Sequence, residues 1–90
     1  MDWAQFYDAA LSLCDKALQV NDSSNLFKFT KSSVLLSLKR YKECIDLCDS
    51  VIAKDSTFLG AYLNAGLSYF NQAVEADKAL KQTDKQKKEI

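Results

Sequence analysis

Three cysteines are the residues of this 90-residue chain best suited to chemistry. Cys44 and Cys48 stand one helical turn apart and could share a metal ion, while Cys14 lies elsewhere in the chain. Zinc sites normally recruit four Cys or His ligands, and this chain has three Cys and no His. A thiol nucleophile also needs a base, for which His is the usual residue. We therefore expect reduced thiols that act as small apolar core residues.

Carboxylates are the second group that could do chemistry, as general acids and bases. Asp46 and Asp49 form one nearby pair, and Asp15 stands beside Lys16. The apolar periodicity around them places these residues on solvent-facing sides of helices, with no predicted pocket. The sequence therefore predicts a protein that is not an enzyme, with no cofactor and no metal.

Composition narrows the class of partner. The 12 basic residues are balanced by 12 acidic ones, so the whole chain has no charge excess to attract nucleic acid or an anionic membrane. No apolar run approaches the roughly 18 residues of a membrane span. The first residues lack the basic start and apolar core of a signal peptide. Cytoplasm is slightly favoured as the compartment, and periplasm stays open if the chain is a fragment.

Apolar residues recur at steps of three and four along most of the chain, as in amphipathic helices. With no Pro and two Gly, the chain suits long helices with short connections. The pattern predicts helices over residues 2–21, 25–38 and 41–54, and a fourth that begins near residue 58. Beyond residue 76 the polar tail is either frayed or an extension of this helix, and we favour the extension. A displaced short helix near Lys78 is the other interpretation.

A fixed spacing relates two stretches of the chain. Tyr41 follows Tyr7 at the same interval by which Cys48 follows Cys14. Four further apolar positions of Tyr41–Ile52 match Tyr7–Leu18 at this interval, which we call the repeat period. A period of about 34 residues is typical of stacked helix–turn–helix units.

These positions resemble the tetratricopeptide repeat family. The pattern of that family's first helix matches Tyr62, Ala65, Gly66 and Tyr69, and the small Ala65–Gly66 pair would mark the close approach of a neighbouring helix. The second-helix pattern matches two sets of residues, Tyr7, Ala10, Leu11, Cys14, Ala17 and Leu18, and Tyr41, Cys44, Ile45, Cys48, Val51 and Ile52. Helix 25–38 departs from the family, because Lys28 and Lys31 replace large apolar residues there and only Ser32 and Leu35 fit.

The resemblance implies an all-α fold, a right-handed stack of antiparallel helix pairs with about four helices in a single domain, residues 1–90. Residues 2–21 would be the second helix of one repeat, 25–56 a full repeat, 58–76 the first helix of the next, and 77–90 a polar tail. Apolar residues near both ends of this stack favour either a fragment of a longer bacterial repeat protein or self-association.

The family's first helices line a concave groove that usually holds a peptide. By resemblance, the groove residues here are Leu26, Phe29, Ser33, Leu36, Leu63, Asn64, Leu67, Phe70 and Asn71. This set has no Lys or Arg, so we do not expect the carboxylate clamp by which some members hold chaperone tails. We expect apolar pockets for a partner's side chains, with Asn64 and Asn71 bonding its main chain.

The predicted function is protein–protein interaction or scaffolding, with a protein or peptide partner and neither nucleic acid nor membrane. The alternative is a structural spacer, possible as a homo-oligomer, whose groove is covered by further repeats or by a second copy of the chain.

Overall fold

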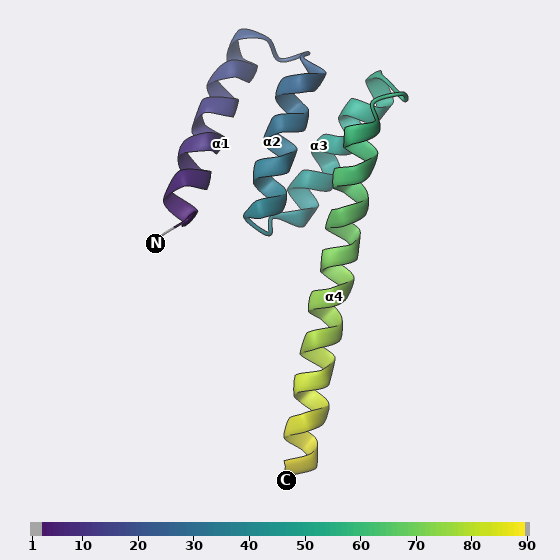
Figure 1. Cartoon of the computed structure of the whole chain (residues 1–90). Helices are drawn as coiled ribbons and strands as arrows, with labels where there is room; N and C mark the ends of the chain where they lie inside the picture. Colours follow the sequence, from purple (N-terminus) through teal and green to yellow (C-terminus); the bar gives the residue numbers. More distant parts are fainter. Residues whose placement is uncertain (1–2, 90) are drawn as a thin grey trace.

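Four helices make up the computed structural model, which describes the backbone of residues 3–89 and the side chains of residues 3–81. They are α1 (Trp3–Val20), α2 (Asn25–Ser37), α3 (Tyr41–Lys54) and α4 (Leu59–Glu89) (Figure 1). The described residues contain no strand, which confirms the all-α prediction. Met1, Asp2 and Ile90 lie outside the described residues, as do the side chains after Lys81.

Short polar connections end one helix and begin the next. The Ser24 side chain caps α2 by accepting a hydrogen bond from the Phe27 amide at 3.2 Å. Lys39 takes a left-handed backbone conformation after α2, and the Arg40 amide then bonds back to the Leu35 carbonyl at 2.9 Å. Asp55 accepts bonds from the Thr57 amide and hydroxyl, which shape the turn into α4 and hold the pKa of Asp55 below its usual value. These local bonds let consecutive helices reverse direction within a few residues.

The core lies among α2, α3 and α4. Its buried residues are Leu35, Cys44, Cys48, Val51, Ala61 and Ala65. Helix α3 packs against both α2 and α4, and α2 also packs against α4. Helix α1 packs against α2 alone among the described helices, so it has no fully buried residue. Figure 1 accordingly shows α1 at one end of the row of helices and α4 at the other.

Helix α4 is the longest element, with 31 residues. It continues through Lys78 and Leu80 and extends well beyond the ends of the other three helices (Figure 1). The expected extension is therefore what the structure shows, and no displaced short helix begins near Lys78. An ion pair between Lys81 and Asp77, one turn apart, supports this solvated part of the helix.

The two glycines of α4 have opposite surroundings. A Cβ atom at Gly60 would lie 2.6 Å from the Phe29 ring, so Gly60 lets α2 and α4 approach each other. A Cβ atom at Gly66 would meet no heavy atom within 4 Å. The expectation of close packing holds for Ala65, which is buried, and is wrong for Gly66 in this structure. The reason is that Gly66 points away from the three-helix core, on the outer side of α4.

Candidate partner-binding surface

The nine residues predicted to line a groove fall into an exposed group and an inner group. Leu26, Leu63, Leu67 and Phe70 are exposed, at 61%, 62%, 39% and 64% of their surface. Phe29, Ser33, Leu36 and Asn71 are half-buried, and Asn64 is buried. The exposed apolar members come mainly from α4, so the candidate surface is centred on that helix.

Asn64 joins α4 to α2. Its side-chain amide donates hydrogen bonds of 2.9 Å each to the hydroxyls of Ser32 and Ser33. Both serines donate in turn to the Phe29 carbonyl. These two bonds use the amide hydrogens of Asn64 inside the molecule, so its side-chain carbonyl oxygen is the group left to bond the main chain of a partner. Asn71, two turns further along α4, is the asparagine of the predicted set that stays partly open to solvent.

Phe29 and Leu36 also contribute to internal packing. The Phe29 ring lies 5.4 Å from the Phe58 ring, centroid to centroid, and covers Gly60. Leu36 packs against the core residues. These two side chains fix the spacing of α2 and α4 and form the base of the candidate surface rather than its exposed rim.

The outer side of α4 is apolar over about four turns. Residues 59–74 contain no charged residue. Their exposed positions form two stripes on neighbouring sides of the helix. The leucine stripe consists of Leu59, Leu63, Leu67 and Phe70, and the tyrosine stripe consists of Tyr62, Gly66, Tyr69 and Ala73; all eight residues are exposed.

Helix geometry places only one of the two stripes beside α2. Gly60 and Asn64 contact α2, and the leucine stripe adjoins that side of α4. The tyrosine stripe lies next to the leucine stripe, on its side away from α2. Contiguous exposed apolar surface of this kind commonly marks a site of protein interaction.

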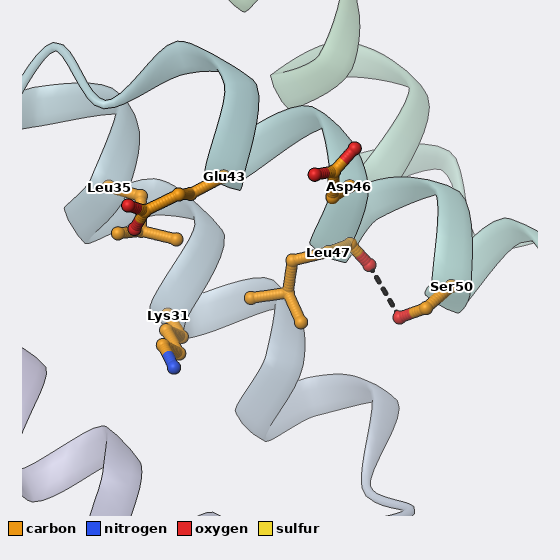
Figure 2. Close-up of a pocket in the computed structure, with 6 residues that line it drawn as sticks. All are labelled: Lys31, Leu35, Glu43, Asp46, Leu47 and Ser50. Carbon is orange, nitrogen blue, oxygen red and sulfur yellow. Dashed lines mark hydrogen bonds between the residues drawn. The ribbon is translucent and has the colours of Figure 1, made fainter.

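A shallow open hollow of about 410 Å³ lies between α2 and α3. It is lined by Lys31, Leu35, Glu43, Asp46, Leu47 and Ser50, and Figure 2 shows Leu47 reaching from α3 toward α2. Lys31 pairs with Asp15 at 2.7 Å, and Glu43 pairs with Arg40. Sequence patterns did not reveal this hollow, because its residues come from two helices whose packing has no local signal. With Lys31 and Glu43 already paired, it is a weaker candidate than the apolar side of α4.

The thiols and carboxylates are not gathered into a reactive site in the described part of the chain. Burial raises the pKa of the Cys48 thiol to about 11, against a smaller lowering by a hydrogen bond with Ser32. Cys44 is buried beside it, and its thiol donates to the Asn64 carbonyl at 3.9 Å. Within residues 3–81, no three Cys, Asp or Glu side chains are grouped to hold a metal ion.

None of the described helices is both long and apolar enough to cross a membrane.

Comparisons of this chain with protein-family models, with curated proteins and with solved structures found no match. The resemblance to tetratricopeptide repeats therefore rests on the residues of this chain alone.

Proposed function

We propose that this chain is a non-enzymatic protein-interaction module, a tetratricopeptide-like helical stack that docks an apolar segment of a partner on the leucine stripe of α4. The observation that carries the proposal is the uncharged run of residues 59–74, with Leu63 and Phe70 each more than 60% exposed. These side chains contribute no burial free energy to the folded chain while they stay in water, and covering them with a partner would release it, so a contiguous exposed set over several turns favours a docking surface.

Two features support the repeat-like architecture. Helix α3 repeats the apolar positions of α1 at the repeat period defined by Tyr7 and Tyr41. Helices adjacent in sequence pack against each other, and α2 also packs against α4, as expected when helix pairs stack in a row. In this arrangement α2 and α4 would share the face that carries Leu26 and the leucine stripe.

Recognition in this proposal is mainly apolar. Leu63, Leu67 and Phe70 would cover the side chains of a partner peptide or helix, and Leu26 would extend the contact onto α2. Asn64 acts indirectly, because its bonds to Ser32 and Ser33 hold α2 and α4 at a fixed spacing. Asn71 lies beside the stripe and would bond the partner's main chain.

The proposal is tested by measuring how the wild-type protein and its Leu63→Lys variant bind the peptides of an array. Leu80→Lys is a matched control, since Leu80 is 65% exposed and Leu63 62%, and Leu80 lies on the part of α4 beyond the stripe. We expect apolar peptides that bind the wild type and the control to lose at least tenfold in affinity with Leu63→Lys, about 1.4 kcal/mol. In NMR spectra of the wild-type protein, the backbone amide signals that shift when such a peptide is added should cluster at residues 59–71. Equal binding by both variants would contradict the proposal.

A further inference from the structure

We infer that the tyrosine stripe of α4 is a docking surface for α1 of a second copy of this chain, so that copies join end to end. The inference uses a surface other than the leucine stripe. It rests on the proposed function only in treating the chain as a stack of repeats.

The argument starts from the interface between α2 and α3. Ser32 and Leu35 of α2 are buried, at 0% and 2% exposure, and Leu47 of α3 packs against the core that contains Leu35. Gly66 and Tyr69 stand one repeat period after Ser32 and Leu35. Both are exposed, and Gly66 has open space around it. The tyrosine stripe thus repeats the side of α2 that α3 covers, but in α4 it has no cover.

Helix α1 shows the complementary half of the same relation. Leu13 stands one repeat period before Leu47 and is 65% exposed. Since α1 repeats the apolar positions of α3, it can offer α4 of a second copy the same kinds of side chain that α3 offers α2. Docking α1 on the tyrosine stripe would therefore continue the α2–α3 interface into the next copy.

Volume and charge fit this pairing. Around Leu13, α1 has Ala10 and Ala17 where α3 has Cys44 and Val51, and these smaller residues leave room for Tyr62 and Tyr69. Residues 9–14 of α1 contain no charged residue, as is true of residues 59–74 of α4. Lys16 stands one turn after Leu13 on the same side of α1, and its long side chain can hold its charge in water at the edge of the contact.

The two surfaces lie at opposite ends of the row of helices (Figure 1). One copy can therefore use its α4 and its α1 at the same time, each with a different neighbour. Such a contact between unlike surfaces propagates into open chains of copies unless the geometry closes a ring. The average mass should rise steadily with concentration rather than level off at a dimer.

Two substitutions block one surface each. Gly66→Arg fills the open space on α4, and Leu13→Glu places a charge on the exposed side of α1. Each position is exposed, so circular dichroism should show unchanged helicity. By light scattering after size-exclusion chromatography, we expect each variant alone to stay at the 10.1 kDa monomer mass at concentrations where the wild type associates.

Mixing the two variants gives the decisive result. Leu13→Glu retains a free α4 surface and Gly66→Arg retains a free α1 surface, so an equimolar mixture should form a single heterodimer of twice the monomer mass. Two control variants should associate like the wild type. They are Leu80→Glu, at a position with the same 65% exposure as Leu13, and Ala53→Arg, at an exposed position of α3.

Three results would overturn the inference. The first is that the wild type stays monomeric at every concentration. The second is that Leu13→Glu still forms a dimer, because two α4 helices pair with each other. The third is that the equimolar mixture of Leu13→Glu and Gly66→Arg forms no heterodimer. Peptide binding measured on Leu13→Glu separates this inference from the proposed function, because the leucine stripe is intact in that variant. Binding without self-association would refute the inference alone.

Discussion

At the scale of single residues, Asn64 links α4 to α2 and fixes their spacing. It is 5% exposed, and its amide bridges to Ser32 and Ser33 across the helix contact. A buried polar group stabilises a fold when it is paired and opposes it when a partner is removed. The residue type predicted a groove asparagine, and the structure adds that its amide group links two helices. Sequence alone could not distinguish these roles, because the direction of the side chain depends on where α2 lies.

Replacing Asn64 with Ala should therefore lower the free energy of unfolding by about 1–3 kcal/mol, since the Ser32 and Ser33 hydroxyls lose a donor. Urea unfolding followed by circular dichroism measures this change. Asn71→Ala is the control, and at its half-buried position we expect a change below about 0.5 kcal/mol. If Asn64→Ala left stability unchanged and weakened peptide binding instead, Asn64 would be a contact residue of the groove.

The cysteines should differ in reactivity by position. At pH 8, a pKa of about 11 leaves roughly one Cys48 thiol in a thousand as the reactive thiolate. Cys14 is half-buried, while Cys44 and Cys48 are buried. With a thiol reagent we expect one fast equivalent, which Cys14→Ser removes, and two equivalents that react only as the chain unfolds. Fast labelling of Cys48 in the native protein would contradict the placement of α3 in the core.

The same pKa has a consequence for stability. Because burial raises the Cys48 pKa from 9.0 to about 11, the unfolded thiol loses its proton first as pH rises. The stabilising contribution is therefore full below pH 9 and is lost between pH 9 and 11. Urea midpoints of the wild type should fall over this interval more than those of Cys48→Ala.

Helix boundaries, at the scale of elements, could be predicted well from sequence. Polar connections such as Asp55–Thr57 stop the apolar period and supply side chains that bond to the backbone, so their signal is local. The long α4 was also predictable, since no turn residue interrupts residues 71–80. Which side of α4 faces the core was not predictable, because the polar residues Asn64, Ser68, Asn71 and Gln72 share one side of the helix, where periodicity predicts solvent. The structure instead buries Asn64 and Ser68 and exposes the leucine stripe.

Gly60 and Gly66 provide a matched pair that tests this orientation. Gly66→Ala should stabilise the monomer by about 0.5–1 kcal/mol, since a glycine inside a helix costs entropy and the site is open. Gly60→Ala should destabilise it by about 1–2 kcal/mol, because the new methyl group would overlap the Phe29 ring. Thermal unfolding at a dilute concentration, where the chain is monomeric, measures both. If Gly66→Ala destabilised the monomer and Gly60→Ala stabilised it, the other side of α4 would face the core.

The whole molecule is elongated for its size. Its radius of gyration is 16.2 Å, against about 12 Å for a compact domain of this length. Its dimensions of 57 × 33 × 15 Å reflect helices stacked side by side, with the long α4 extending beyond the others (Figure 1). A row exposes more apolar surface than a closed bundle, so both outer helices keep exposed apolar residues, such as Leu13 and Leu63. This geometry is why we place function on the surface of α1 and α4 rather than in a pocket.

The central claim is that the apolar side of α4 faces solvent until a partner covers it. Methyl NMR with a soluble paramagnetic probe, on dilute wild-type chain, tests it most directly. We predict strong broadening of the Leu63 and Leu67 methyl signals and little effect on Leu35 and Val51, which are 2% and 0% exposed. If the Leu63 and Leu67 methyl groups were as protected as those of Leu35, they would belong to the core, and the account of α4 as a docking surface would be wrong.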